Sequence, residues 1–176
     1  TGDMGYMRDA EMLYVVGRFK SLLIGADGEK YSPEGIEENI AENSPYISDI
    51  LLHNNQDPYT IGLVVPAWDA LKAYAKEQKS GIDLKSDEAK SLMLAKIHAE
   101  VAEYRKGGKF AGLFPDRWVP SVLCILPEPF TEQNGMMNST MKVVRGKVEK
   151  AYQNYIDLAY ASDKKEEFEA LNKASL

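Results

Sequence analysis

The segment that decides the fold covers residues 47–65 and reads ISDILLHNNQDPYTIGLVV. Two β-rich runs, 47–52 and 60–65, enclose the turn-rich stretch 53–58. Branched and aliphatic residues favour strands, whereas clustered Asn, Asp and Pro favour a reversal of the chain. We therefore expect the two runs to pair as neighbouring strands.

Helical patterns lie on both sides of this strand pair. Ser32 and Pro33 are typical of a helix start, as an N-cap and a first-turn proline, and the helix is expected to run to about Asn43. Residues 68–79 form a second predicted helix. Residues 86–105 form a third, because apolar residues recur there at helical spacing.

The remaining chain supplies one more strand and one more long helix. A third strand is predicted at 119–126, where two following prolines end it. Apolar residues at helical spacing over 144–159 predict a final long helix, followed by a charged tail, 161–176, expected as a frayed helix. With β-prone runs and a turn between residues 13 and 31, the fold class is α+β. We expect an N-terminal hairpin and linker, then a small, roughly three-stranded sheet packed with helices.

Composition bounds the class of protein. A length of 176 residues with 44% hydrophobic and 27% charged residues is typical of one globular domain. The net charge of −6 argues against broad attraction to nucleic acid, so no nucleic-acid partner is expected. Cys124 is the one cysteine and lies in an apolar run, which predicts a buried thiol and a reducing compartment.

Targeting signals are absent from the sequence. No apolar run reaches the ~20 residues that span a bilayer, and the start at Thr1 has no signal-peptide pattern. We expect a cytoplasmic protein without a transmembrane segment, with peripheral membrane association left open. Because the sequence also lacks an initiator Met, we interpret it as a piece of a longer protein.

Several catalytic patterns are missing too. The sequence has no Cys or His cluster for zinc, no Gly-x-Ser-x-Gly nucleophile elbow and no phosphate loop, so no metal site is predicted. His53 and His98 stand alone, and we expect structural or solvated roles for both. Trp68 and Trp118 lie beside predicted strands and are expected in the core.

Two groups of motifs contain unusual residue types in a fixed order. The first group reads TGDMGY at 1–6, YVVGRFK at 14–20 and GEKYSP at 28–33, which leads to Ile36 and Glu37. The second group reads PFTEQNG at 129–135 and NSTMKVVR at 138–145. Together they resemble the closing motifs of the AMP-forming acyl-CoA synthetases, in the adenylate-forming superfamily, and their spacing resembles the fatty acyl-CoA ligase branch.

This resemblance implies how the chain is divided. Residues 1–20 would be the end of a large N-terminal domain and the hinge. Residues 21–160 would be the mobile C-terminal domain, and 161–176 the charged C-terminal tail. The partner of this chain would then be its own large domain.

The resemblance also implies roles for residues of the first motif group. Asp3 matches an aspartate that accepts hydrogen bonds from the ribose hydroxyls of ATP and AMP, and Arg18 matches an arginine near the ribose and phosphate. Lys20 falls at the hinge about which the small domain rotates. Gly25 and Gly28 bracket a loop that lines the pantetheine tunnel of CoA, although a tight hairpin turn would need the same glycines.

Lys142, in the second motif group, matches the family's catalytic lysine. A positioned ammonium there would offset the charge that develops at the α-phosphate while the acyl carboxylate attacks. The implied reaction uses ATP with Mg to convert a fatty or similar carboxylic acid to an acyl-adenylate, then transfers the acyl group to CoA. ATP and Mg would be bound mainly by the large domain, so this chain alone is expected to be inactive.

Two other functions stay open. In one, the chain belongs to an adenylation module that delivers the acyl group to a carrier protein and not to free CoA. In the other, it is a non-catalytic interaction domain that retains the motifs. The stretch 107–118 resembles an insertion, and we expect Arg105, Lys106 and Lys109 to be solvated there and not to bind CoA phosphates.

Overall fold

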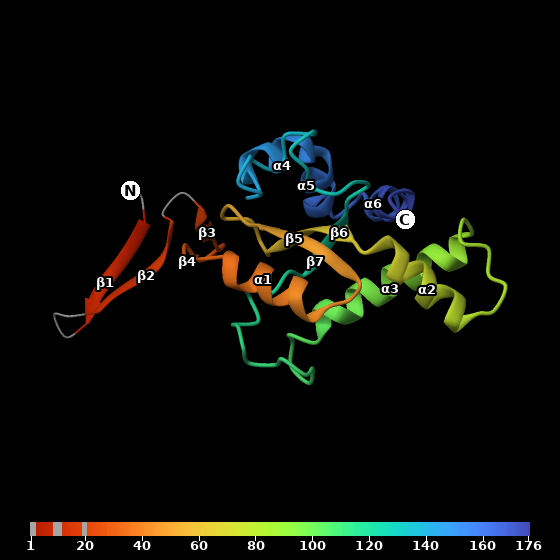
Figure 1. The fold of residues 1–176 in the computed structure, drawn as a ribbon, viewed down its shortest axis with the longest axis horizontal. Coiled ribbons are helices and arrows are strands. Elements are labelled where there is room, and N and C mark those ends of the chain that lie inside the picture. The colour runs from red at the N-terminus through yellow and green to blue at the C-terminus, as the bar shows by residue number, and fades with distance from the viewer. Residues whose placement is uncertain (1–2, 9–11, 19–20) are drawn as a thin grey trace.

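A mixed three-stranded sheet forms the centre of the molecule. The computed structural model describes residues 3–8, 12–18 and 21–176. Strand β5 (Ile47–His53) pairs antiparallel with β6 (Ile61–Pro66), which pairs in parallel with β7 (Val122–Ile125) (Figure 1). The predicted pairing of the first two strands is confirmed, and the third strand is shorter than expected.

Helices cover both faces of this sheet. The helices of one layer are α1 (Glu34–Asn43), α2 (Trp68–Gln78) and α3 (Asp87–Ala102). The helices of the other layer are α4 (Arg145–Ala151), α5 (Gln153–Tyr160) and α6 (Lys165–Ala174). Figure 1 shows α4, α5 and α6 on the opposite side of the sheet from α1. The expected α+β class, with a small sheet packed between helices, is confirmed.

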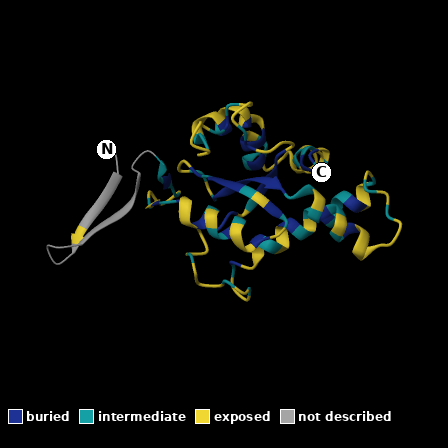
Figure 2. Cartoon of the chain, viewed as in Figure 1, coloured by how far each residue is buried: buried dark blue, intermediate teal, exposed yellow. Residues whose placement is uncertain are grey.

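The alternation of side chains along the strands creates two hydrophobic cores. In β7, Leu123 and Ile125 pack in the core beneath α1, α2 and α3, while Cys124 between them packs in the core beneath α4 and α5. Successive side chains of a strand point to opposite faces, so one short strand serves both cores. The buried residues in Figure 2 accordingly follow the sheet between the two helical layers.

Two small hairpins precede the sheet. Strand β1 (Asp3–Arg8) pairs with β2 (Met12–Arg18), and β3 (Leu23–Ile24) pairs with β4 (Lys30–Tyr31). The β-prone runs of the sequence are therefore strands, but they belong to separate hairpins. The first strand of the chain was not predicted, because its glycine and methionines give no clear alternation.

The final long helix that the sequence predicts is two helices. Tyr152 ends α4 and precedes α5, with φ −110° and ψ 27°. Its buried ring meets that of Tyr155 edge to face, and its hydroxyl donates a hydrogen bond to Glu128 at 3.3 Å. Val148 and Tyr155 are buried on either side of the break, so the apolar spacing continues through it. The spacing alone therefore could not reveal the interruption.

The charged C-terminal residues are more ordered than expected. Helix α6 packs against α5 and β7 and is not a frayed end. The buried Asn172 accepts a hydrogen bond from Ile125 N at 2.8 Å and donates one to Leu123 O at 3.0 Å. Its amide thus bonds the free edge of β7 in the way a neighbouring strand would. Among the helices of the described residues, none combines the length and apolar character needed to cross a membrane.

Candidate functional site

Lys142 lies on a tight turn that the side chain of Asn138 closes. Asn138 Oδ1 accepts hydrogen bonds from Thr140 N at 3.0 Å, Thr140 Oγ1 at 2.8 Å and Lys142 N at 2.9 Å. Asn138 N also donates to Lys142 O at 2.9 Å, and Met141 has a φ of 58°. Asn favours turns of this kind because its amide bonds the following backbone. The Lys142 side chain is exposed beside the 80% exposed Met141.

Arg145, three residues later, is tied to two distant parts of the chain. Its Nη2 donates to both carboxylate oxygens of Glu37, each at 2.8 Å, and its Nη1 donates to Leu52 O at 2.6 Å. Glu37 Oε1 also accepts a hydrogen bond from Leu52 N at 2.6 Å. The end of the Lys142 motif is therefore fixed to α1 and to β5.

The Glu37–Arg145 ion pair is largely removed from solvent. The Glu37 side chain is 14% exposed and that of Arg145 is 20% exposed. Burial raises the pKa of the Glu37 carboxyl, while the charge of Arg145 and the Leu52 N–H oppose that increase. A buried carboxylate needs such partners, because an unpaired one would be costly to desolvate. The sequence offered no local signal for this contact.

Gly25 and Gly28 shape a tight loop between β3 and β4. Gly25 N donates to Glu29 O at 2.8 Å, and Gly28 N donates to Gly25 O at 2.9 Å. Gly28 has a φ of 82°, a conformation that residues with a side chain rarely adopt. A Cβ at Gly25 would lie 2.9 Å from Asp27 Oδ1. The hairpin turn itself thus requires a glycine at position 28, whatever the loop binds, whereas a Cβ at Gly25 would displace only the carboxylate of Asp27.

Arg117 and Trp118, at the end of the stretch 107–118, brace this loop. Arg117 Nε and Nη2 donate to the Glu29 carboxylate at 2.6 and 2.7 Å, and Trp118 Nε1 donates to it at 2.9 Å. The Trp118 ring stacks on Tyr31 with 5.0 Å between centroids. These contacts hold the pKa of the Glu29 carboxyl below its usual value, mainly through the Arg117 hydrogen bonds.

A cavity of about 220 Å³ lies between the braced loop and the β5–β6 connection. Its lining includes Gly25 and Asp27 of the glycine loop, together with Tyr59 and Trp118. The sequence placed Trp118 in the core, and its ring does pack against the core of α1, α2 and α3. The sequence did not indicate that Trp118 also holds the loop.

Arg105 and Lys109 make local contacts. Arg105 Nη2 donates to Val119 O and Pro120 O, each at 3.0 Å, and so joins the end of α3 to the strand that follows. Lys109 Nζ lies 4.8 Å from the centre of the Phe110 ring. Lys106 is exposed. Arg105 is therefore a structural residue and not a solvated one.

Asp3 and Arg18 are opposite residues of the β1–β2 hairpin. They occupy the first and last positions of their strands and are partners in the backbone register. The structure thus brings together the backbones of the two residues for which the sequence predicts nucleotide binding. Lys20, the predicted hinge, lies outside the described residues.

His53 has a carboxylate partner, His98 lies on the surface, and Cys124 is buried. His53 Nδ1 forms a hydrogen bond with Glu149 Oε1 at 2.8 Å, and His98 is exposed on α3. Burial raises the pKa of the Cys124 thiol to about 12, in line with the buried thiol that the sequence predicts. The described residues contain no group of three or more His, Cys, Asp or Glu side chains suited to a metal ion.

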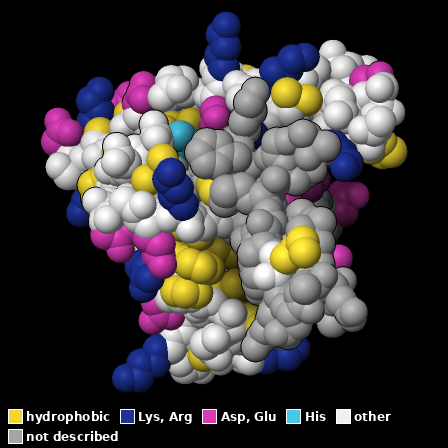
Figure 3. Space-filling model, turned by 90° about the vertical axis from the view of Figure 1, so that its left-hand side faces the viewer, with side chains coloured by type: hydrophobic (Ala, Val, Ile, Leu, Met, Phe, Trp, Pro, Cys, Tyr) yellow, Lys and Arg dark blue, Asp and Glu magenta, His cyan; other side chains and the backbone are white. Residues whose placement is uncertain are grey.

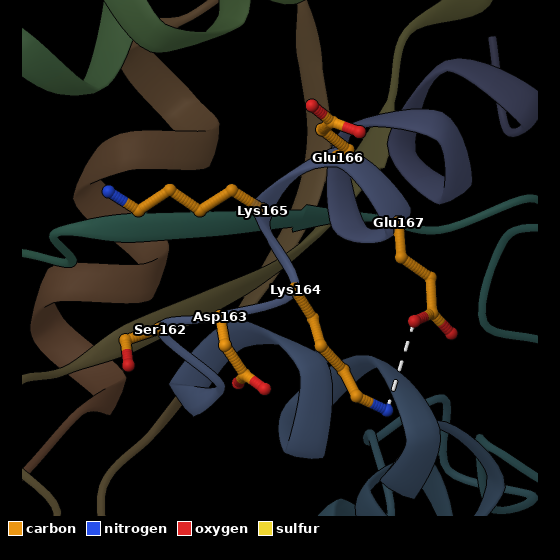
Figure 4. A pocket seen from close by; sticks show the side chains of 6 residues that line it. All are labelled: Ser162, Asp163, Lys164, Lys165, Glu166 and Glu167. Atoms are coloured by element: carbon orange, nitrogen blue, oxygen red, sulfur yellow. Dashed lines mark ion pairs between the residues drawn. The ribbon is translucent and has the colours of Figure 1, made fainter.

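An open depression of about 420 Å³ at the start of α6 does not have the character of a site. It is lined by six consecutive residues, 162–167, whose side chains point in different directions (Figure 4). Lys164 and Glu167 form an ion pair at 3.8 Å with both side chains more than half exposed. The described side chains on the face nearest the N-terminal hairpin include interspersed basic and acidic groups (Figure 3). On neither of these two surfaces do the described charged side chains converge as they would around a bound ligand.

Comparison by sequence finds similarity to enzymes that activate fatty acids. No protein-family model matches the chain. Long-chain-fatty-acid–CoA ligase 5 of Mus musculus is 32% identical over 162 residues, which cover 92% of this chain and 23% of the ligase. The probable chloroplastic acyl-activating enzyme 16 of Arabidopsis thaliana is 31% identical over 172 residues, covering 91% and 22%. The chain spans about a quarter of the length of these relatives.

Comparison by structure finds the same fold in adenylating enzymes. The adenylation domain of a carboxylate reductase from Mycobacterium chelonae superposes with a TM-score of 0.69 at 23% identity, covering 92% of this chain and 23% of that one. A structure from a study of fatty acyl-adenylate ligases from E. coli and L. pneumophila has a TM-score of 0.52 at 27% identity, covering 89% and 22%.

Proposed function

Because the chain is homologous to a segment of the long-chain-fatty-acid–CoA ligases, we propose that it is the mobile C-terminal domain of such a ligase. Residues 1–20 would contain the end of the large domain and the hinge, with Lys20 as the pivot. Residues 21–160 would form the moving body, followed by the C-terminal residues 161–176. The large N-terminal domain of the same protein would be its main partner.

The complete protein would activate a fatty or similar carboxylic acid with ATP. The acyl carboxylate would attack the α-phosphate, which gives an acyl-adenylate and pyrophosphate. The thiol of CoA would then lose its proton and attack the acyl carbonyl, which gives acyl-CoA and releases AMP. Asp3 and Arg18 would contact the nucleotide from the paired ends of the β1–β2 hairpin. Mg would accompany ATP on the large domain, and the Gly25–Gly28 loop would meet the pantetheine arm during the second step.

The observation that carries this proposal is the presentation of Lys142. Its side chain is exposed, yet its backbone is held by the Asn138 turn and its motif is anchored through Arg145. The turn fixes where the Lys142 side chain leaves the backbone, so its ammonium can be directed at the charge that develops between a carboxylate and a triphosphate. A lysine that served only solubility would not need an anchored turn.

One comparison supports an enzyme that does not use CoA as the acceptor of the acyl group. The structural similarity to fatty acyl-adenylate ligases supports an enzyme that stops at the acyl-adenylate. Delivery of the acyl group to a carrier-protein thiol is the further alternative that the sequence leaves open. Product analysis of the full-length protein, with free CoA and with a carrier protein as competing acceptors, distinguishes the two. Acyl-CoA as the main product supports the ligase.

The experiment that tests the proposal measures the two half-reactions of the full-length protein separately. Lys142→Ala should slow ATP–pyrophosphate exchange in the presence of the carboxylic acid substrate by about 10² to 10³-fold. This is the scale for losing one preorganised charge-stabilising group. Thioester formation from a supplied acyl-adenylate should continue. Lys147→Ala, which removes an exposed lysine from α4, serves as the matched control. Unchanged turnover in Lys142→Ala would favour the non-catalytic interaction domain instead.

A further inference from the structure

The Glu37–Arg145 pair lies at the free edge of the sheet. Strand β5 is an edge strand, since the order of the sheet is β5-β6-β7. Leu52 N donates to Glu37 Oε1, and Leu52 O accepts from Arg145 Nη1, both at 2.6 Å. The ion pair therefore satisfies both peptide groups of one edge residue, as a further strand would.

This arrangement fixes the direction in which the chain leaves the Lys142 turn. Arg145 is the first residue of α4, and its planar guanidinium has three partners at 2.6 to 2.8 Å. A fork of this kind restricts both the position and the orientation of the arginine. Asn138 fixes the other side of the turn through three hydrogen bonds. The backbone is thus fixed on both sides of Lys142, by Asn138 four residues before it and by Arg145 three residues after it.

We propose that Glu37 is a positioning residue for Lys142 and acts on it through Arg145. The inference rests on the proposed function, in which Lys142 is the catalytic residue. Glu37 itself is distant in sequence from the motif and is mostly buried, so it does not meet the substrate. It sets the geometry of the turn that presents the ammonium.

A purely structural role is the competing explanation. The pair would then only cap the edge of β5, and its loss would lower stability without a preference for one half-reaction. Glu37→Gln separates the two explanations, because the amide keeps the shape of the side chain and one acceptor oxygen but removes the charge. Glu38→Gln on the same helix changes an exposed carboxylate and is the matched control.

The first measurement uses the chain itself and does not depend on any activity. Hydrogen exchange is followed at the amides of Thr140 and Lys142, which Asn138 protects. Glu37→Gln should speed their exchange by about tenfold or more, the scale of losing one charge-assisted hydrogen bond. Glu38→Gln should leave it unchanged. Unchanged exchange in Glu37→Gln overturns the inference.

The second measurement uses the full-length protein and separates the half-reactions. Glu37→Gln should lower kcat of adenylation by up to about 10², the cost of a small misplacement of a reacting group, with little change in KM. Arg145→Lys, which keeps the charge but loses the fork, should act in the same direction. Thioester formation from a supplied acyl-adenylate should stay within about twofold of wild type, since neither variant removes a group used in that step.

A double variant supplies the decisive comparison. If Glu37 acts through Lys142, adding Glu37→Gln to Lys142→Ala should cost almost nothing further, because residues of one network are not additive. Additive losses, or equal losses in both half-reactions, overturn the positioning role. A wild-type protein that forms no acyl-adenylate would instead overturn the proposed function, and with it any kinetic role of Glu37. Unchanged Thr140 exchange in an active enzyme overturns the positioning inference alone.

Discussion

Arg117 holds Glu29 through two hydrogen bonds, of 2.6 and 2.7 Å, across 88 residues of sequence. The contact joins the stretch 107–118 to the loop that contains Gly25 and Gly28. Trp118 adds a third hydrogen bond to the same carboxylate at 2.9 Å. A loop that would otherwise depend on its own turn is thus braced from a second part of the chain.

Arg117→Ala should loosen this loop. We expect faster hydrogen exchange at the amides of Gly25 and Gly28 and little change in the midpoint of urea unfolding, because exposed ion pairs add little to stability. In the full-length protein, thioester formation should fall while ATP–pyrophosphate exchange is retained. Asp116→Ala, which changes an adjacent exposed residue, is the control. If the amides of Gly25 and Gly28 exchange as slowly in Arg117→Ala as in the wild type, Arg117 does not brace the loop.

Asn172→Ala should lower the stability of the chain. The change leaves Ile125 N and Leu123 O without their partners at the buried edge of β7. Each unsatisfied buried group costs about 1–3 kcal/mol, so urea unfolding should show a clear loss. Asn154→Ala on the exposed face of α5 should cost far less. If the two substitutions lower the free energy of unfolding equally, Ile125 N and Leu123 O find other hydrogen-bond partners when Asn172 is replaced.

Gly108 and Gly35 should respond oppositely to alanine. A Cβ at Gly108 would lie 2.3 Å from the backbone oxygen of Glu103, so the turn after α3 would have to shift. At Gly35, on the exposed side of α1, a Cβ meets nothing within 4 Å. Gly35→Ala should stabilise the chain by about 0.5–1 kcal/mol, the helical preference of Ala over Gly. Thermal unfolding of the two variants tests this, and a stable Gly108→Ala chain would contradict the expected clash.

The stability of the chain should fall at high pH because of Cys124. Burial raises its thiol pKa from 9.0 to about 12. A raised folded pKa means that the stabilisation is complete below about pH 9 and is lost as the pH rises toward 12. Between pH 9 and 10 the loss should be about 1 kcal/mol, because the unfolded thiol is already half ionised at pH 9 and the full slope of about 1.4 kcal/mol per pH unit applies only above that.

The matched variant for this pH dependence is Cys124→Val, which keeps an apolar side chain in the same core. Urea unfolding of both chains at pH 7.5, 9 and 10 compares them with and without the thiol, because the buried Tyr152 and the partly buried Tyr160, whose pKa values are also raised, are common to both. The free energy of unfolding of the wild-type chain should fall relative to that of Cys124→Val as the pH rises. Parallel curves would show that Cys124 does not ionise on unfolding.

The sequence was most informative where structure depends on neighbouring residues. The β-rich runs of residues 47–65 predicted the central strand pair, and the helical spacing of residues 68–105 predicted α2 and α3. The break at Tyr152 was missed, because the apolar spacing of α4 continues into α5. Local patterns report which face is buried, but not whether the backbone stays helical throughout.

Long-range contacts of the candidate site had no such signal. Glu37 and Arg145 are 108 residues apart. Each ends one of the two motif groups, but nothing in the sequence pairs one with the other. Only the packing of α1, β5 and α4 together gives them a shared position. Lys142 was predicted from its motif, and Asn138 and Arg145 belong to the same motif. The hydrogen bonds by which they support the turn became visible only in the structure.

The last prediction concerns the hinge. Lys20 lies between a segment that matches a large domain and one that matches a mobile domain, and hinges are short stretches that absorb large changes in φ and ψ. Lys20→Pro fixes φ near −65° and removes an N–H, so in the full-length protein it should trap one orientation. If that orientation is the adenylating one, acyl-adenylate should still form while transfer to CoA falls sharply, the opposite pattern to Lys142→Ala. Lys20→Ala keeps the backbone freedom and should retain both steps. Isotope exchange and stopped-flow assays measure each half-reaction, and wild-type rates for both in Lys20→Pro would remove Lys20 as the pivot.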